Sequence, residues 1–301
     1  MLTIFTPTYN REKTLPRLFE SLKKQTCFDF EWLILDDGST DETRTLIDGW
    51  KNETLPFSIR YQRVDNEGKN RAVNKGVQMA KGMYFFIVDS DDFLLPDAVS
   101  YVLECFSKIP NNDKFIGIST IRGDLDRKPL KRKALIDENI GYVDCNNLER
   151  AKYNLTADMA EVFFTEKIKL YPFPVWEGEK FTPEAVIWDR MALDGYILRW
   201  YNKVVYLCEY QKEGLSASSW SLLRDNPMGY AMLFNIRLEY TQNVKNNINY
   251  VIQYISCCCL ADQKEQIFKC AKPVLAMLLL PIGWIISLRR RKQIKEKCKQ
   301  M

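Results

Sequence analysis

The sequence of 301 residues contains no histidine. Histidine is the commonest general base at neutral pH and the commonest zinc ligand in proteins. Any acid–base chemistry must therefore fall to Asp, Glu, Lys, Cys or Tyr side chains. A strong net charge is also lacking, since the formal charge of +4 is too small to indicate nucleic acid as a partner.

Cysteine pairs with the spacing of a redox or zinc motif are absent as well. The nine cysteines include no CxxC pair, although Cys257–Cys259 stand next to one another. No secretory signal precedes the first apolar run, which leads quickly to Pro7. A reduced, cytoplasmic compartment fits these features, and we expect the cysteine trio to pack inside a helix.

Strand and helix signals alternate regularly over the N-terminal third of the chain. Apolar runs typical of buried strands are Leu2–Thr6, Trp32–Leu35, Ser58–Val64 and Tyr84–Val88. Helix-like stretches between them are Leu15–Gln25, Glu42–Trp50 and Lys69–Lys81. This order predicts an α/β fold with a mostly parallel, Rossmann-like sheet flanked by helices. Such sheets bind ligands at the carboxyl ends of their strands.

The remainder of the chain is less regular. We expect the charged segment Arg122–Lys133 to be a surface loop, and Tyr153–Gln211 to contain strands without clear bounds. Two long helices are predicted at Pro227–Lys245 and Ile248–Lys269.

Polar and acidic residues follow three of the predicted strands. Thr6–Arg11 follows the first strand, Asp36–Asp41 the second and Asp89–Asp92 the fourth. Strand ends that converge on one edge would bring several carboxylates together, and their mutual repulsion requires a cation or a network of donors. Carboxylate oxygens favour a hard ion such as Mg²⁺ or Mn²⁺, which typically bridges protein carboxylate and substrate phosphate. The pattern therefore indicates a nucleotide-diphosphate site.

A purely structural interpretation treats Asp36–Ser39 as a turn and Asp41 as the N-cap of the next helix. Asp and Ser favour both positions, and we assign Asp41 the capping role. Either acidic cluster alone could be an ordinary loop. Two clusters that each directly follow an apolar strand favour a binding site.

The ordered set of motifs resembles the family 2 glycosyltransferases. The motifs are Thr6–Arg11, Leu35–Asp41, Gly68–Gly76 and Phe86–Asp92, and the resemblance covers roughly residues 1–215. It implies the GT-A fold and a DXD motif, matched here by Asp89-Ser90-Asp91. It also implies an inverting enzyme that moves a sugar from a nucleotide-diphosphate donor, with UDP expected, to an acceptor hydroxyl. Polysaccharide or other cell-surface glycan synthesis is the implied context.

The resemblance also implies roles for individual residues. Pro7, Tyr9 and Asp37 would contact the nucleobase, with Tyr9 stacking on it. Lys69 would pair with phosphate as a point charge, and Asp89 would lie near the ribose.

The metal ion of the family, Mn²⁺ or Mg²⁺, would be bound by Asp91. Such an ion neutralises the charge that develops on the leaving diphosphate when the sugar–phosphate bond breaks. Asp92 would either support the ligands of this ion or begin the helix that follows.

The general base is the point at which the sequence departs from the family. The family places a carboxylate, often within a Glu-Asp pair that opens a helix, well after the DXD motif. The register of the segment Glu177–Arg190 puts Glu184 at that place, directly after Pro183, which suits the first turn of a helix. We expect Glu184 to be the base, with Glu179 and Asp189 as alternatives. A first-turn acid that interacts with the helix dipole is the structural interpretation of Glu184.

The C-terminal tail combines apolar and basic character. No charged residue occurs from Val274 to Leu288, and the basic run Arg289–Lys292 follows. A spanning helix needs about 20 apolar residues, and Pro281 and Gly283 are expected to interrupt this segment. We therefore expect it to lie in or dip into the membrane interface, with Trp284 at headgroup level and the basic run against anionic lipid. The alternative is a helix packed on the catalytic domain.

These features predict the organisation of the whole chain. A catalytic domain would cover residues 1–215, with a nucleotide-sugar half at 1–110 and an acceptor half at 111–215. A helical extension at 216–270 and a membrane-associating tail at 271–301 would follow. The protein would be peripheral or monotopic on the cytoplasmic face of the membrane, and a glycan or lipid-linked saccharide would be its acceptor.

Three other classes compete with this interpretation. A sugar nucleotidyltransferase or a Rossmann dehydrogenase would show a glycine-rich loop after the first strand, and Thr6–Arg11 contains no glycine. A relative that binds nucleotide sugar without turnover remains open because of the departure at Pro183-Glu184.

Overall fold

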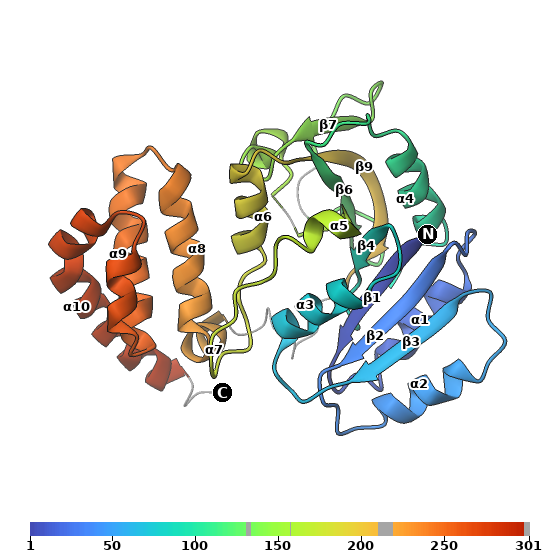
Figure 1. The fold of residues 1–301 in the computed structure, drawn as a ribbon, viewed down its shortest axis with the longest axis horizontal. Coiled ribbons are helices and arrows are strands. Elements are labelled where there is room, and N and C mark those ends of the chain that lie inside the picture. The colour runs from blue at the N-terminus through green and yellow to red at the C-terminus, as the bar shows by residue number, and fades with distance from the viewer. Residues whose placement is uncertain (131–133, 157, 210–218, 298–301) are drawn as a thin grey trace. The chain divides into compact units, whose positions relative to one another are not determined.

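The computed structural model describes residues 1–130, 134–156, 158–209 and 219–297. Contacts divide the chain into two compact units (Figure 1). Unit 1 comprises Met1–Pro172 and Asp194–Tyr210, and unit 2 comprises Phe173–Leu193 and Gln211–Met301. The predicted boundary at residues 215 and 216 lies outside the described residues.

Unit 1 is built on a nine-stranded sheet. The strands are β1 Leu2–Thr8, β2 Phe30–Asp36, β3 Ser58–Arg63, β4 Tyr84–Ile87, β5 Phe93–Leu94, β6 Phe115–Gly123, β7 Tyr142–Cys145, β8 Met159–Phe164 and β9 Ile197–Leu207. Their order is β3-β2-β1-β4-β8-β6-β9-β5, and β7 pairs with β9. The pairs β1–β2, β1–β4, β2–β3 and β6–β9 are parallel, whereas β8 runs antiparallel to β4 and β6. The predicted α/β fold with a parallel N-terminal sheet is confirmed.

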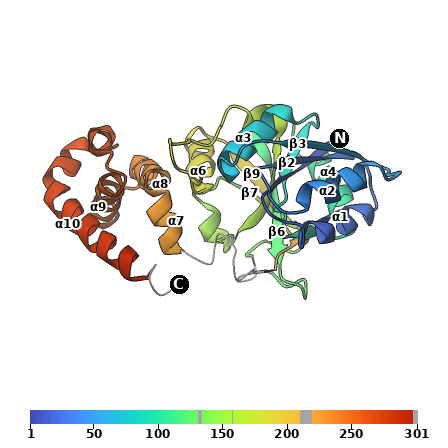
Figure 2. The same ribbon diagram turned by 90° about the horizontal axis from the view of Figure 1, so that it is seen from below.

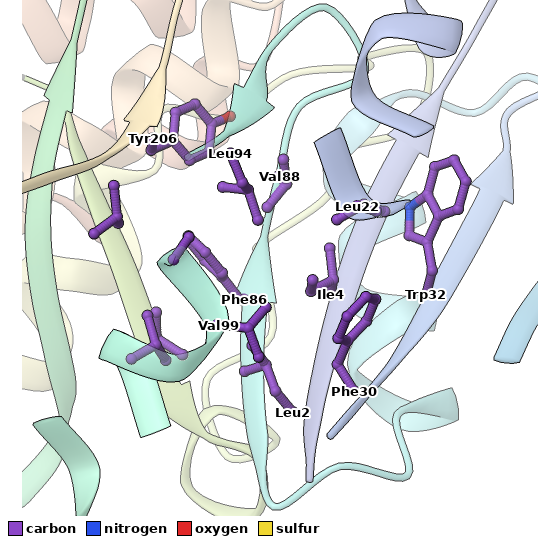
Figure 3. Packing of buried hydrophobic residues seen from close by; sticks show 14 of the residues in the cluster. Leu2, Ile4, Leu22, Phe30, Trp32, Phe86, Val88, Leu94, Val99 and Tyr206 are labelled. Atoms are coloured by element: carbon purple, nitrogen blue, oxygen red, sulfur yellow. The ribbon is translucent and has the colours of Figure 1, made fainter. Parts of the chain in front are cut away.

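Helices cover both faces of this sheet. They are α1 Leu15–Lys23, α2 Thr43–Lys51, α3 Lys69–Met79 and α4 Ala98–Ser107, with short turns at α5 Thr165–Ile168 and η1 Arg150–Tyr153. Side chains of α1, α2 and α4 share one apolar cluster with Leu2, Ile4 and Trp32 of the strands, as Figure 3 shows in part. Helix α3 lies on the opposite face (Figure 2). There the ring of Phe5 stacks on that of Phe85, with centroids 5.3 Å apart.

Helix α3 approaches the sheet closely because of Gly76. A Cβ atom at this position would lie 2.1 Å from the ring of Phe5. Glycine inside a helix costs about 1 kcal/mol relative to alanine. The close packing of α3 on β1 explains why glycine stands here, and it places the start of α3 near the carboxyl ends of β1 and β2.

One sequence prediction in unit 1 is wrong. The segment from Arg122 was expected to be a surface loop, but Arg122 and Gly123 complete β6, which pairs with β9. Residues 131–133 of that predicted loop lie outside the described residues. The consequence for Arg122 is chemical, because the strand carries its side chain into the acidic edge of the sheet.

Unit 2 is helical. Its elements are α6 Ala185–Leu193, α7 Ser219–Asp225, α8 Pro227–Tyr240, α9 Val244–Leu260, η3 Lys264–Lys269 and α10 Pro273–Lys297. The break before α9 falls earlier than predicted because the side chain of Asn243 caps this helix by accepting the N–H of Asn246. Cys257, Cys258 and Cys259 are buried in α9, which confirms the prediction for the trio.

Helix α10 is continuous, contrary to the expected interruption at Pro281 and Gly283. Pro281 lies on the exposed side, whereas Gly283 is buried at a close approach to α9. A Cβ on Gly283 would lie 2.5 Å from Cγ2 of Ile255. Among the described residues, Pro273–Glu296 is the one helix long and apolar enough to cross a membrane, with a mean hydropathy of 1.4. That finding rests on length and composition only.

A buried carboxylate ties the amino-terminal edge of the sheet together. Glu31 of β2 is 2% exposed and accepts hydrogen bonds from the Thr3 hydroxyl at 2.7 Å and the Lys81 N–H at 2.7 Å. Arg60 of β3 donates to its other oxygen at 2.9 Å. Burial by itself would raise the pKa of Glu31, but these three donors outweigh it and the pKa is lowered.

We predict that Glu31→Gln lowers the free energy of unfolding by about 1–3 kcal/mol at pH 7, because the amide puts a donor where Arg60 or Lys81 donates. The pKa of Glu31 is lower in the folded than in the unfolded state. The ionised carboxylate therefore contributes to the free energy of unfolding above the ordinary glutamate pKa of about 4.3, and this contribution is lost as pH falls through the folded-state pKa. Urea unfolding at pH 7 and at pH 3.5 measures the difference. The exposed control Glu20→Gln should change little, and a pH-independent deficit for Glu31→Gln would contradict the assignment.

Candidate active site

Three of the predicted motif segments meet at the carboxyl edge of the sheet. Thr8 at the end of β1 lies opposite Asp36 at the end of β2, and β4 ends beside β1. The N–H of Asp37 donates to the carbonyl of Thr8 at 2.8 Å, which continues the ladder into the loop. Parallel pairing therefore brings the segments after β1, β2 and β4 together, as the sequence predicted.

Asp89 is held by two cations. Nζ of Lys69 lies 2.7 Å from one carboxylate oxygen, and Arg122 donates to the other at 3.3 Å. Burial alone would raise the pKa of Asp89, but the charges of Lys69 and Arg122 hold it well below the usual range. Its backbone N–H donates to the hydroxyl of Tyr206 at 2.9 Å. Lys69, predicted as a phosphate ligand, is thus in direct contact with the first aspartate of the DXD motif.

Arg122 is a residue of this acidic edge that the sequence analysis did not single out. Its guanidinium lies 4.3 Å from the ring centroid of Tyr206 and bridges Asp89 to Asp92, whose Oδ2 is 3.8 Å away. The sequence does contain a signal, because Arg122 directly follows the mostly apolar run Phe115–Ile121, as aspartates follow the strands that became β2 and β4.

Asp92 faces inward rather than starting the next helix, which begins later at Ala98. It is 6% exposed, and the thiol of Cys208 donates to it at 3.4 Å. Burial and the neighbouring charge of Asp89 raise the pKa of Asp92 to about 6, against the opposing effect of Arg122. Asp92 therefore supports the motif from within the protein.

Asp91 is placed differently from its neighbours. Its backbone carbonyl accepts a hydrogen bond from Arg17 at 2.6 Å, and Arg17 also pairs with Glu209. Its carboxylate stays partly exposed, with Nη2 of Arg11 3.6 Å away. The loop is thus anchored through its backbone while an acidic side chain remains accessible.

The donor set fits a hard divalent ion that shares its ligands with a substrate. Asp91 offers carboxylate oxygens with their nearest cation, Arg11, 3.6 Å away, whereas Lys69 contacts Asp89 at 2.7 Å and Asp92 is buried. Across the described part of the chain, no three His, Cys, Asp or Glu residues are grouped to hold an ion. Mg²⁺ and similar ions are typically bound by one or two carboxylates together with substrate phosphates. Asp91 would hold such an ion as part of a complex with phosphate.

The residues expected at the nucleobase lie on the same edge. Tyr9 is 46% exposed, as a stacking surface requires, and Pro7 is buried within β1. The two oxygens of Asp37 accept the N–H groups of Glu67 and Gly68, each at 2.8 Å. Asp37 therefore fixes the loop that leads into α3, and with it the position of Lys69.

Asp41 is not the N-cap residue of α2, as was predicted, but the residue before it. Helix α2 begins at Thr43 with Glu42 at the N-cap position. The carboxylate of Asp41 accepts the N–H groups of Thr43 and Glu12, each at 3.1 Å. Burial would raise the pKa of Asp41, but hydrogen bonds from Thr43 and Glu12 lower it on balance.

The three candidate bases lie in unit 2 and have different surroundings. The carboxylate of Glu179 accepts the N–H groups of Met228 and Gly229 at 2.7 and 2.9 Å and so caps α8. Asp189 is 4% exposed and accepts a hydrogen bond from the Tyr240 hydroxyl at 3.2 Å. The partly buried Glu184 directly precedes α6, and its carbonyl accepts the N–H groups of Ile187 and Trp188.

Comparison with known proteins identifies the family. Residues 3–167 match the family model for glycosyl transferase family 2. A chondroitin synthase of Escherichia coli is 40% identical over 109 residues, which are 36% of this chain and 16% of that protein. An uncharacterized glycosyltransferase of Haemophilus influenzae is 32% identical over 111 residues, or 37% of this chain and 36% of that protein. The chain belongs to glycosyl transferase family 2, which decides against the nucleotidyltransferase and dehydrogenase alternatives.

Solved structures agree on the fold. The 1–349 segment of TarS from Staphylococcus aureus, in complex with UDP-GlcNAc, matches with a TM-score of 0.63 at 15% identity, over 99% of this chain and 91% of that one. The mannosyltransferase PcManGT of Pyrobaculum calidifontis, in complex with GDP-Man and Mn²⁺, matches with a TM-score of 0.56 at 16% identity, over 98% and 83%. The predicted GT-A fold with a helical C-terminal region is confirmed. The chain spans less than two fifths of the length of the two sequence relatives above.

We predict that Arg122→Leu destabilises the protein by about 3–5 kcal/mol, because it leaves Asp89 and Asp92 close together without their shared cation. Arg122→Lys should recover part of the loss. The control Lys128→Met removes an exposed ion pair with Asp126 and should cost less than about 1 kcal/mol. Unfolding in urea gives the three values, and equal losses for Arg122→Leu and Lys128→Met would contradict the bridging role.

Proposed function

We propose that this protein is an inverting hexosyltransferase that moves a sugar from a UDP-sugar to an acceptor hydroxyl in the synthesis of a polysaccharide or other cell-surface glycan. The observation that carries the proposal is the carboxyl edge of the sheet in unit 1. It combines an exposed aromatic ring at Tyr9, a cationic group at Lys69 and an accessible carboxylate at Asp91. These groups match the base, the diphosphate and the metal ion of a nucleotide-sugar complex.

The donor would lie along this edge. Tyr9 would stack on the uracil, and Pro7 and Asp37 would border it. Lys69 would exchange its contact with Asp89 for one with a phosphate oxygen, which frees Asp89 to accept from the ribose. The complexes of TarS with UDP-GlcNAc and of PcManGT with GDP-Man support a nucleotide sugar as the donor.

Asp91 would hold Mn²⁺ or Mg²⁺ together with the diphosphate. When bound, the ion supplies Lewis-acid stabilisation of the leaving diphosphate. Arg17 and Arg122 keep the aspartates of the motif in place before the donor arrives, so that little reorganisation is needed when charge develops.

Glu184 would take the proton from the acceptor hydroxyl. The acceptor oxygen then bonds to the anomeric carbon as the bond from that carbon to the diphosphate oxygen breaks, which inverts the configuration. Glu179, which caps α8, and the buried Asp189 are the alternative bases.

The acceptor would be a glycan or a lipid-linked saccharide at the cytoplasmic face of a membrane. The basic and apolar tail motivates this location, with anionic lipid as its partner. The small net charge gives no reason to expect a nucleic-acid partner.

Asp91→Ala identifies the donor site. We expect the protein to release UDP from one member of a panel of UDP-sugars in the presence of Mn²⁺ or Mg²⁺. Asp91→Ala should lower the rate of UDP release at least about 100-fold, because it removes a protein ligand of the metal ion that stabilises the leaving diphosphate. Calorimetry should show tighter Mn²⁺ binding with UDP present than without it, because Asp91 alone completes no coordination shell. Failure of every nucleotide sugar to bind would refute the proposal.

Glu184→Gln separates turnover from binding. The amide cannot accept the acceptor proton, so turnover should fall by about 10²–10⁴-fold while the Kd for UDP measured by calorimetry stays unchanged. The controls Glu179→Gln and Asp189→Asn should lower the melting temperature more than Glu184→Gln does. Full activity of Glu184→Gln would exclude it as the base.

A further inference from the structure

Helix α10 carries its most apolar side on the outside. Its exposed residues at helical spacing form one stripe, here called the outer stripe, that consists of Val274, Met277, Leu278, Pro281, Ile285 and Leu288. The side chains of the five non-proline members are 45–73% exposed. Contiguous apolar surface of this kind marks an interaction site on a protein surface.

The inner side of α10 is packed within unit 2, where Leu275 and Leu279 join the apolar cluster around α9. Ala276, Gly283 and Ser287 are buried toward α9 within unit 2. Arg290 donates to the hydroxyl of Ser256 at 3.2 Å, and Arg291 donates to the carbonyl of Cys259 at 2.6 Å. The packing of α10 on α9 therefore buries the inner side of the helix and leaves the outer stripe exposed.

The end of the outer stripe is basic. Lys292 and Lys295 continue the stripe by one and two turns beyond Leu288. Together with Leu288, Arg291 and Glu296 they line an open hollow of about 440 Å³. An apolar surface that leads into a cluster of cations is complementary to acyl chains beside anionic headgroups.

We propose that α10 docks the protein on an anionic lipid surface by lying flat, with the outer stripe in the interface and the basic end among the headgroups, and that it does not span the bilayer. The proposal deepens the membrane location given above and does not depend on which sugar is transferred. The hydrogen bonds of Arg290 and Arg291 to α9 hold the inner side of α10 on unit 2. From Val274 to Leu288 the stripe measures about 21 Å at 1.5 Å per residue, which is short of the ~30 Å hydrocarbon core.

A lipid surface fits better than a second copy of this chain. Parallel pairing of two outer stripes would bring Lys292 and Lys295 against their counterparts, where like charges repel. Antiparallel pairing would press these lysines onto the apolar part of the other stripe. An anionic bilayer satisfies both parts of the stripe at once.

The test is sedimentation of the full chain with vesicles of phosphatidylcholine, with and without a share of phosphatidylglycerol. We expect binding that needs the anionic lipid and weakens with salt. Leu278→Glu/Ile285→Glu should lower the partition coefficient at least tenfold. The control Met83→Glu/Leu170→Glu places the same charges on exposed side chains of unit 1 and should leave it unchanged. Circular dichroism and thermal melting establish that both double variants fold.

An impermeant amine reagent added outside the vesicles distinguishes lying from spanning. We expect Lys272 and Lys295, at the two ends of α10, both to be modified in the bound protein. Protection of one end would show a spanning helix and overturn the proposal. Absence of vesicle binding, with a dimer that Leu278→Glu/Ile285→Glu dissociates, would also overturn it and assign the stripe to self-association. Neither readout uses turnover, so the glycosyltransferase proposal can fail independently.

Discussion

The structure of unit 1 depends on neutralising the acidic charge at the carboxyl edge of its sheet. Asp89 and Asp92 cannot both stay ionised in a partly buried site without a counter-charge. Arg122 and Lys69 supply that charge from a distant strand and from the start of a helix. This requirement constrains the neighbouring strands and helices, because one of them must hold each cationic side chain beside the aspartates.

Several local features serve this arrangement. Asp37 accepts two backbone N–H groups and so fixes the turn from which Lys69 starts α3. Gly76 lets that helix lie against β1, and β6 carries Arg122 to the opposite side of Asp89. At the other edge of the sheet Glu31 plays a comparable role with Arg60, but inside the protein and away from any ligand. Paired charges thus stand at both the amino-terminal and the carboxyl edge of the sheet.

The sequence predicted the parts of this design that depend on short-range pattern. Apolar runs with polar ends located β1 to β4, and parallel pairing then dictated that the segments around Tyr9, Asp37 and Asp91 meet. Arg122 escaped prediction because its role depends on the pairing of β6 with β9, which joins distant parts of the chain. The structural roles of Glu179 and Asp189 were hidden for the same reason, since Met228 and Tyr240 lie far along the sequence.

The proline at 281 shows how context overrides a local rule. A proline inside a helix removes a hydrogen bond, which led to the expectation of a break. The helix continues because Gly283 and Ala276 on the other side let it pack tightly on α9. Proline at an exposed position therefore left the inner contacts intact.

The packing of α10 on α9 determines how a soluble variant of this protein is best made. A tail that is only an anchor can be deleted to obtain a soluble protein. Here deletion of α10 would uncover Ile255, Cys257 and Cys259 on α9, together with the polar groups that Arg290 and Arg291 satisfy. A truncated chain would exchange one apolar surface for another, and exposed thiols would add oxidation to the risk of aggregation. Charged substitutions along the outer stripe are the better route, because they alter the surface and keep the helical layer whole.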